Sequence, residues 1–354
     1  MQTYPQQSKG GPLFTLSAII PNYNHGAYIH QAIDALNKQI PAPDEIIVVD
    51  DASTDNSLDM LAHLQALYPR LRIVALDKNG GAINALNRGL HEAKGEYIYF
   101  GAADDVTEPG LFEALFPLAR AHPQVPFVSC AGMVEDVDTG HKSMRPPAMP
   151  AFQNAHFSPE QVRALFKRID NWILTGSAII RRDAMLAIGG LNPTLGAMAD
   201  GYAMRHLAFA QGCCFSPHIG LVWRIRASGL SRTMAGNPAA SIKALEDALE
   251  MMRADPAFPA WYPEVFARRW RFSIGRIALS DKAVNGAVLF QAVARNRLDS
   301  LILQLCIRFY RWGGRFFALG WLFLREYPMA VSDLIVTALR NTWRYKLLKL
   351  YPDS

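Results

Sequence analysis

Two pairs of adjacent aspartates are the residues of this sequence best placed to do chemistry. Asp50 and Asp51 follow one apolar run, and Asp104 and Asp105 follow another that is rich in aromatic residues. Carboxylate oxygens are the ligands that Mg²⁺ and Mn²⁺ prefer, and such an ion can in turn hold a diphosphate. The alternative for the second pair is a solvated turn that caps a helix expected to begin near Pro109.

Strands and helices that alternate along the chain are expected to bring these acids together. Continuous apolar runs predict buried strands at 16–20, 45–51 and 72–76, and a fourth that begins at 97 and ends in the acids at 104–105. Helical spacing and turn residues predict helices at 27–39, from an N-cap at 53–55 to 67, at 82–93 and at 109–121. This alternation favours a parallel sheet covered by helices on both faces. Parallel strands share their carboxyl edge, so both acidic pairs should meet the loop at 21–24 in one crevice.

Length, charge and composition exclude several classes of protein. The chain has 354 residues, half of them hydrophobic, and a net charge of +5, which suits one large domain with a smaller appendage. It has no glycine-rich dinucleotide fingerprint after the first strand and no Walker A lysine. It also has no apolar leader and no apolar run of about 18 residues. Four cysteines without metal-ligand spacing indicate reduced thiols, so we expect a cytoplasmic protein, peripheral at most on the inner face of a membrane.

The order and spacing of four segments resemble the inverting glycosyltransferases of family 2, which have the GT-A fold. The segments are Ser17–Asn24, Ile46–Ser57, Asn79–Gly89 and Gly95–Pro109, and the resemblance covers roughly residues 15–235. It implies an α/β fold of the Rossmann-like GT-A type, with a mostly parallel sheet, helices on both faces and a C-terminal helical extension. It also implies a nucleotide-sugar donor and a divalent cation, Mn²⁺ or Mg²⁺.

The resemblance assigns roles to the residues of the expected crevice. It implies contacts with the nucleotide for Pro21, Asn22, Tyr23, Asp50, Asp51, Asn84 and Asp104. Asp105 would bind the metal ion on the diphosphate. The family often has Asp-x-Asp-Asp at this point, and here Ala102 stands in place of the first acid.

Three residues further along the chain are assigned by the same resemblance. Asp200 opens a helix predicted to continue to 211. Its role could be purely structural, as the N-cap of that helix. The alternative is that it acts as the general base, which the family has at this position. Arg226 stands where the family commonly has a histidine, so it could neutralise the diphosphate or be a solvated loop charge. Trp172 begins a segment that resembles the family's acceptor half, which makes it a candidate on the diphosphate or acceptor side.

Composition divides the chain into three parts. A flexible polar tail at 1–14 precedes the transferase domain at 15–236, and a basic, aromatic, helical region occupies 237–354. Arginines among the leucines and aromatic residues of the last part suit helices that lie in the headgroup layer of a membrane. The alternative is a helical subdomain that packs on the transferase domain or forms a homo-oligomer. Nucleic acid is not an expected partner, because the predicted crevice is acidic.

Together these features predict an inverting transfer of sugar from a nucleotide diphosphate, a UDP-sugar, to a hydroxyl of a glycan or lipid-linked acceptor. The setting would be the assembly of surface glycans, glycolipids or polysaccharides. Processive members of the family carry Gln-x-x-Arg-Trp, and Phe266 replaces the glutamine here, so we expect addition of one or a few sugars. A sugar-nucleotide pyrophosphorylase would need a glycine-rich basic loop after the first strand, which residues 22–25 do not supply. A non-catalytic scaffold that binds the nucleotide sugar and is recruited by its C-terminal helices is the alternative.

Overall fold

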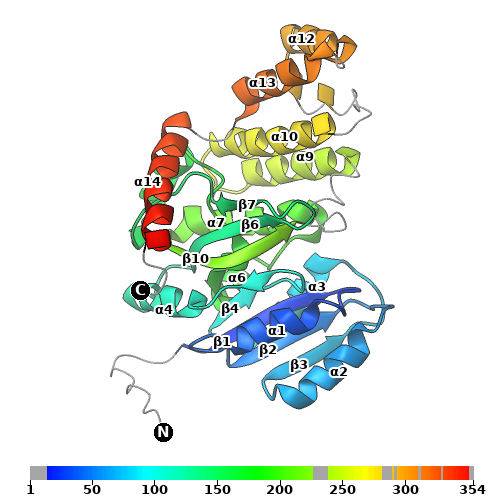
Figure 1. Ribbon diagram of the computed structural model, residues 1–354, viewed down its shortest axis with the longest axis vertical. Coiled ribbons are helices and arrows are strands. Elements are labelled where there is room, and N and C mark those ends of the chain that lie inside the picture. The colour runs from blue at the N-terminus through cyan, green and yellow to red at the C-terminus, as the bar shows by residue number, and fades with distance from the viewer. Residues whose placement is uncertain are drawn as a thin grey trace.

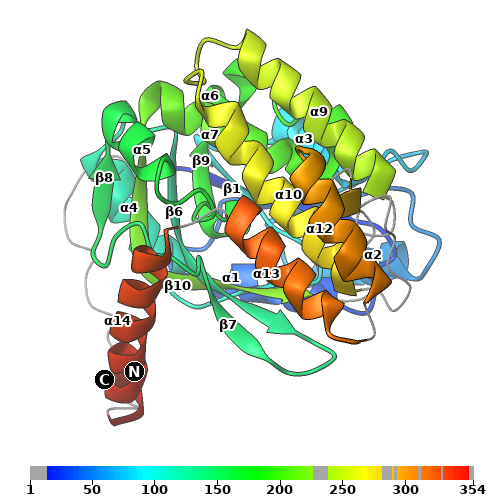
Figure 2. The same ribbon diagram turned by 90° about the horizontal axis from the view of Figure 1, so that it is seen from above.

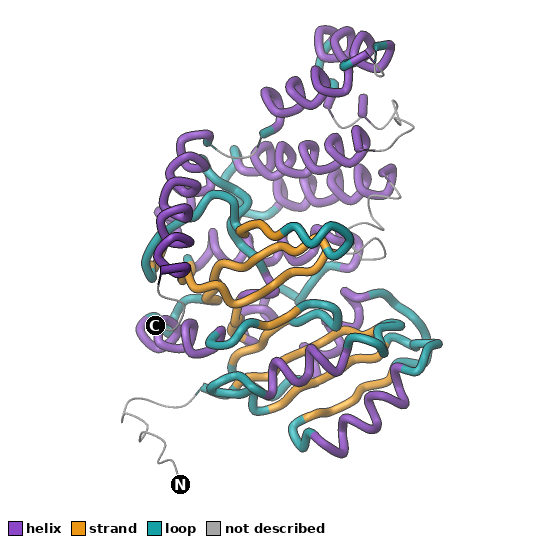
Figure 3. The backbone as a smooth tube through the Cα atoms, in the orientation of Figure 1, coloured by secondary structure: helices purple, strands orange, loops and turns teal. Residues whose placement is uncertain are grey.

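A ten-stranded mixed sheet runs through the middle of the protein, with helices packed outside it (Figures 1 and 3). The structure is a computed structural model, and it describes residues 14–225, 238–280, 289–290, 293–309, 312–327 and 330–350. The predicted tail at 1–14 and the residue Arg226 therefore lie, apart from position 14, outside the described residues.

The amino-terminal half of the sheet is parallel. It consists of β1 (Leu16–Asn22), β2 (Glu45–Asp50), β3 (Leu71–Ala75) and β4 (Tyr97–Phe100), in the order β3-β2-β1-β4. The helices that follow the first three strands are α1 (Ile29–Asn37), α2 (Ser57–Leu67) and α3 (Ala82–Glu92). The predicted α/β fold with a mostly parallel sheet is confirmed, with small shifts at the ends of the elements.

Side chains of each strand alternate between two hydrophobic clusters, one on each face of the sheet. On β1, Ile19 joins one cluster and its neighbours Ala18 and Ile20 join the other. On β4, Ile98 and Tyr99 separate in the same way. Because successive strand residues point to opposite faces and helices cover both, most strand positions are apolar and the sequence shows nearly continuous apolar runs.

The other half of the sheet mixes strand directions. β9 (Ala178–Arg181) lies antiparallel between β4 and β6 (Phe127–Asp136), β6 is parallel to β10 (Cys213–Ile225), and β5 (Val106–Thr107) is antiparallel to β10. The short strands β7 (Lys142–Arg145) and β8 (Ala155–Phe157) pair with β6 and β10. The helical elements of this half are α4 (Leu111–Ala121), α5 (Pro159–Phe166), η1 (Thr175–Ser177), α6 (Arg182–Ala187), η2 (Pro193–Met198) and α7 (Ala199–Gln211).

The acidic pair at 104–105 does not cap α4. That helix begins after Gly110, whose φ of +80° glycine adopts at little cost, and no side chain caps it. The interpretation of residues 104–105 as a helix cap is therefore wrong. At the start of α2, by contrast, Oδ1 of Asp55 accepts the backbone N–H of Ser57 at 2.9 Å, so capping chemistry is present within the predicted residues 53–55 although Asn56 is the N-cap.

The carboxyl-terminal region adds α9 (Pro238–Ala254), α10 (Tyr262–Ser280), α12 (Arg297–Arg308), α13 (Gly314–Glu326) and α14 (Val331–Leu350). Buried side chains of α9 and α10 belong to the same hydrophobic cluster as the sheet, whereas α10, α12 and α13 share a separate one. α13 packs against α10 and α12 packs against α13, and Figure 2 shows α14 apart from these helices. The predicted boundary at 236–237 lies outside the described residues. Within the described ranges, no helix is long and apolar enough to cross a membrane.

Gly89 lets α3 pack closely against β1 and β2. A Cβ at this position would lie 2.3 Å from Cγ2 of Ile19 and 3.3 Å from Cγ2 of Val49. We expect Gly89→Ala to lower the free energy of unfolding by about 1–3 kcal/mol, because overpacking forces the backbone to shift. Urea denaturation followed by circular dichroism measures this change.

Gly320→Ala on α13 is the matched control. Nothing lies within 4 Å of the Cβ that it would add, so the variant should keep its stability or gain up to about 1 kcal/mol from helix propensity. Equal stability of Gly89→Ala and the wild type would show that α3 moves freely away from β1.

Candidate active site

The ends of β1, β2 and β4 lie at one edge of the sheet, as predicted. Asn22 at the end of β1 pairs with Asp50 at the end of β2, and Ile19 pairs with Phe100 at the end of β4. The backbone N–H of Asp51 also donates to the carbonyl oxygen of Asn22, at 2.8 Å. Both acidic pairs thus follow strands that end at this edge, where open α/β sheets bind ligands.

Asp50 fixes the loops that follow β1 and β2. The carboxylate is fully buried, and its Oδ2 accepts hydrogen bonds from Nδ2 of Asn22 and from Oγ of Ser53, both at 2.7 Å. Its Oδ1 accepts the backbone N–H of Ser53 at 2.9 Å. Asn22 is buried as well. These two predicted nucleotide contacts therefore hold the floor of the site together in this structure.

Asp51 fixes the loop that follows β3. Its Oδ1 accepts the N–H of Gly80 at 2.8 Å, and its Oδ2 accepts the N–H of Gly81 at 2.7 Å. Gly81 has a φ of +88°, which a residue with a side chain adopts only under strain. Asn84, in the first turn of α3, is exposed and donates to the carbonyl oxygen of Gly80 at 2.5 Å. The buried Asp51 therefore holds the loop that positions the exposed amide of Asn84.

Tyr23 is the exposed aromatic residue of this edge. It follows the half-buried Pro21 and the buried Asn22, and 43% of its surface is exposed. The next residue, Asn24, holds the loop in place because its Oδ1 accepts the N–H of Thr54 at 2.7 Å. A fixed and exposed ring of this kind can stack on a planar base.

Asp104 and Asp105 are the half-exposed acids of the edge, and they lie in the turn between β4 and β5. Oδ1 of Asp105 accepts the backbone N–H of Arg224 at 2.9 Å, close to the end of β10. This bond ties the turn to the neighbouring strand. The carboxylate of Asp105 is therefore held by a backbone contact, and both carboxylates remain partly in contact with solvent.

The same pair is the candidate for holding a divalent cation. Among the residues that the structure describes, no group of three or more His, Cys, Asp or Glu side chains could hold a metal ion. Mg²⁺ and similar ions are commonly bound through one or two carboxylates together with substrate phosphates and water. Asp104 and Asp105 fit that arrangement, in which an ion arrives with a diphosphate, and do not form a cage of protein ligands.

The 3₁₀ turn η1 connects the acidic turn to α7. Tyr99 of β4 donates its hydroxyl to the carbonyl oxygen of Gly176 in η1 at 2.9 Å, and the same hydroxyl lies 3.3 Å from Oγ1 of Thr107. η1 in turn packs against α7. η1 therefore joins β4, the strand that precedes the acidic pair, to α7.

Asp200 lies in the first turn of α7 and is not its N-cap. The N-cap is Met198, and no side chain caps the helix, because η2 runs directly into it. Oδ1 of Asp200 accepts the N–H of Gly201 at 2.6 Å, and the residue is half-buried. The N-cap interpretation is wrong, but a carboxylate in the first helical turn is still favoured by the helix dipole.

Trp172 packs in the core of the protein. Only 1% of its surface is exposed, and its ring contacts those of Phe157, Phe166 and Phe215. In this structure it offers no surface to a diphosphate or an acceptor, which corrects the expectation from the sequence.

Comparison with known proteins bears on these observations. Residues 17–187, which contain both acidic pairs, match the sequence model of the family described as glycosyl transferase family 2. This part of the chain belongs to that family. The succinoglycan biosynthesis protein ExoO of Rhizobium meliloti is 27% identical over 252 residues, which are 68% of this chain and 66% of ExoO. Alignments with the first curated relatives are shorter and cover about a third of their length, namely 34%, 30% and 29%.

Two solved structures have a similar fold. TarS 1-349 of S. aureus, in complex with UDP-GlcNAc, gives a TM-score of 0.62 at 17% identity, with 90% of this chain and 93% of that chain covered. The mannosyltransferase PcManGT from Pyrobaculum calidifontis, in complex with GDP-Man and Mn²⁺, gives 0.55 at 18% identity, with 94% and 88% covered. At these identities the likeness establishes the fold alone.

A buried ionic cluster lies next to Asp200, which follows the part of the chain that matches the family model. Arg205 of α7 is buried, and its Nε donates to Oδ1 of Asp170 at 3.0 Å. Its Nη1 donates to the carbonyl oxygen of Gly201 at 3.1 Å. Tyr262 of α10, also buried, donates its hydroxyl to the same oxygen of Asp170 at 2.5 Å. The cluster therefore joins α7 to the carboxyl-terminal region.

Arg269 of α10 brings a second guanidinium group to the cluster. Its Nε lies 3.7 Å from Oδ2 of Asp170, an oxygen that accepts no hydrogen bond within the described structure. Burial, and then repulsion by Arg205, lower the pKa of Arg269 to about 10, against the opposing charges of Asp170 and Asp200. At neutral pH the side chain remains a cation.

Gly201 makes room for both guanidinium groups. A Cβ at this position would lie 3.3 Å from Nη2 of Arg269 and 3.5 Å from Nη1 of Arg205. The glycine thus lets two cations pack against the first turn of α7, directly beside Asp200. Their charges contribute to the electrostatic environment of that carboxylate.

Sequence analysis missed this cluster, although one signal was present. Arg205 follows Ala203 and Met204, and it precedes Leu207 and Ala208, all of which are buried on α7. An arginine inside such a run needs a buried partner. The partner, at position 170, is 35 residues away along the chain, so no local pattern identifies it.

We expect Asp170→Asn to lower the free energy of unfolding by about 3–5 kcal/mol. The substitution removes the negative charge and leaves the buried guanidinium of Arg205 and the half-buried one of Arg269 without it, and breaking a buried ion pair from one side costs this much. Denaturant titration of the full chain measures the loss.

Asp247→Asn is the control for removal of a paired aspartate. Asp247 forms a surface ion pair with Lys243 at 2.6 Å on α9, and exposed pairs contribute little. Its unfolding midpoint should match that of the wild type. A midpoint shift in Asp170→Asn no larger than that of the control would contradict the role given to the cluster.

Proposed function

We propose that this protein is an inverting glycosyltransferase that moves a sugar from a UDP-sugar to a hydroxyl group. The acceptor would be a glycan or a lipid-linked sugar in the assembly of a surface glycan, glycolipid or polysaccharide, and one or a few sugars would be added. The observation that carries the proposal is the meeting of an exposed aromatic ring and half-exposed acids at the carboxyl edge of the sheet. Tyr23, Asp104 and Asp105 supply these groups.

The donor is inferred from the edge and from the relatives. Tyr23 can stack on the base, and Asn84 is an exposed amide in the helix that follows β3. The solved structures of TarS and PcManGT are complexes with UDP-GlcNAc and GDP-Man respectively, so the fold serves more than one base. We choose UDP because the sequence segments resemble members that bind uracil.

The chemistry assigned to the chain is a single displacement at the anomeric carbon. Asp200 would accept the proton of the acceptor hydroxyl as that oxygen attacks from the side opposite the diphosphate. Asp104 would bind the ribose, and Asp105 would hold Mn²⁺ or Mg²⁺ on the diphosphate. When bound, the ion supplies positive charge that stabilises the leaving diphosphate.

Asp105→Asn tests the role of the acidic pair in nucleotide binding. In calorimetric titration with UDP, the wild type should bind more tightly with Mn²⁺ than without it. The variant keeps an oxygen for the N–H of Arg224 but loses the charge, so its affinity with Mn²⁺ should fall about tenfold or more. Without Mn²⁺ the two proteins should bind alike.

Asp138→Asn is the matched control, because it removes an exposed acid after the end of β6. It should titrate like the wild type. An unchanged titration of Asp105→Asn would remove the proposed metal role. Failure of the wild type to bind UDP under any condition would direct the search to other nucleotides.

Asp200→Asn tests the general base. UDP affinity should be unchanged, while kcat for release of UDP from the best of a panel of UDP-sugars should fall by about 10²–10⁴, the usual contribution of a positioned base. The control is Asp183→Asn, which removes an exposed acid from the first turn of α6.

Turnover of Asp200→Asn at the wild-type rate would exclude the carboxylate as the base. Tight UDP binding by a wild type that turns over none of the donors would instead favour the non-catalytic scaffold. These two outcomes are distinct, because the first needs an active wild type and the second an inactive one.

A further inference from the structure

The end of the protein formed by α12 and α13 exposes large apolar side chains. Trp312 is 90% exposed, Phe316 is 77% exposed and Phe317 is 76% exposed. Leu324, two turns further along α13, is also exposed. Figure 1 shows these helices at the opposite end of the molecule from β3. Soluble monomeric proteins rarely expose a large contiguous apolar surface unless something binds there.

A stripe of apolar residues on α12 adds to this surface. Its members recur at spacings of three and four residues and are all exposed: Leu298, Leu301, Leu305 and Phe309. Residues three or four apart lie on one side of a helix. A different side of α12, with Leu303 and Cys306, is buried in the cluster shared with α10 and α13. α12 therefore has one apolar side that packs and a second that meets solvent.

The unpaired charges of the two helices are positive. The acids in the described parts of 293–327 are Asp299 and Glu326, and both are buried and paired, with Arg325 and Arg295 respectively. Three exposed arginines form no ion pair with any residue that the structure describes: Arg297, Arg308 and Arg315. The apolar surface is thus accompanied by cations and by no exposed acid among these residues.

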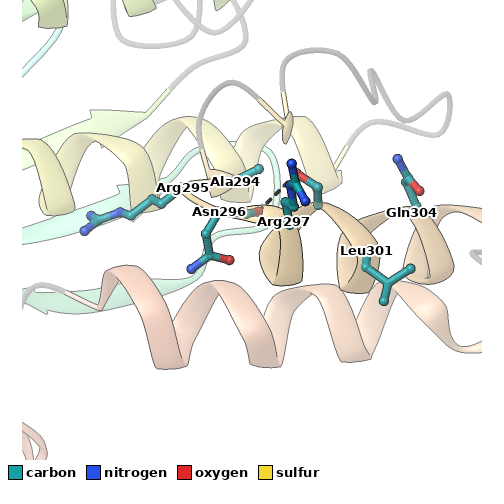
Figure 4. Close-up of a pocket in the computed structure, with 7 residues that line it drawn as sticks. Ala294, Arg295, Asn296, Arg297, Leu301 and Gln304 are labelled. Carbon is teal, nitrogen blue, oxygen red and sulfur yellow. Dashed lines mark hydrogen bonds between the residues drawn. The ribbon is translucent and has the colours of Figure 1, made fainter.

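Cationic and apolar groups also meet in a surface hollow at the start of α12 (Figure 4). Arg297 and Leu301 both line it. Arg295 lines it as well, but is held by Glu264 at 2.7 Å and Glu326 at 2.6 Å. The guanidinium of Arg297, which forms no ion pair with any described residue, could contact a lipid phosphate there, while the side chain of Leu301 could contact the first methylene groups of the lipid.

We propose that these outward sides of α12 and α13, hereafter the α12–α13 face, bind the surface of an anionic membrane. Leucine, phenylalanine and tryptophan side chains would enter the boundary between headgroups and acyl chains, and the arginines would meet lipid phosphates. A second copy of the chain fits this face poorly. A two-fold contact sets the same patch against itself, and would bring the unpaired arginines of both copies together.

Vesicle flotation with the full chain tests the proposal. The protein should float with vesicles that contain phosphatidylglycerol, remain behind with phosphatidylcholine alone, and lose binding as salt is raised. In the variant Arg308→Gln/Arg315→Gln, each lost charge should weaken binding about fivefold. Trp312→Ser/Phe316→Ser should weaken it further, at every salt concentration.

Matched controls replace exposed residues of the same types elsewhere. Leu67→Ser on α2 and Arg120→Gln on α4 remove an exposed apolar side chain and an exposed arginine, and both should bind vesicles like the wild type. Circular dichroism shows that each variant is folded. The test needs no donor or acceptor, so its result is independent of the proposed transferase activity.

Three results would overturn the proposal. The first is the absence of flotation with anionic vesicles at low salt, and the second is equal flotation of the wild type and the α12–α13 variants. The third is a dimeric mass in light scattering that Trp312→Ser/Phe316→Ser returns to a monomer, which would assign this face to a second copy.

Discussion

A buried carboxylate shared by two guanidinium groups ties the main parts of this protein together. Asp170 accepts hydrogen bonds from Arg205 of α7 and from Tyr262 of α10, and Arg269 lies within ion-pair distance of it. Charges removed from water are costly unless each has a partner. α7, α10 and the segment between α5 and η1 that carries Asp170 therefore have to keep their relative positions. The first turn of α7, which carries Asp200, is held with them.

The acids at the sheet edge divide into two kinds. Asp50 and Asp51 are buried, and their oxygens accept hydrogen bonds from the loops after β1, β2 and β3. Asp104 and Asp105 stay half-exposed in a turn tied to β10. The buried pair gives the edge its shape, and the half-exposed pair is the one with oxygens near solvent. The same residue type thus serves two purposes, and burial distinguishes them.

The carboxyl-terminal helices divide in a similar way. α9 and α10 extend the hydrophobic cluster of the sheet. Part of the basic and aromatic sequence that suggested a membrane helix is therefore packed inside the protein, and its Arg269 belongs to the ionic cluster. α12 and α13 build a cluster of their own and keep large apolar side chains outside. The packing hypothesis made from the sequence is therefore confirmed for α9 and α10, while membrane binding by α12 and α13 stays a proposal.

The sequence by itself determined the sheet, the order of its first four strands along the chain and the edge at which the acids meet. These follow from local patterns, because apolar runs, turn residues and the shared direction of parallel strands are all visible in short segments. Only the tertiary structure decided that Trp172 is a core residue, that Asp200 lies within its helix, and that Asp170, Arg205 and Arg269 form one cluster. Burial and ion pairing between distant segments depend on how elements pack, and no window of sequence contains that information.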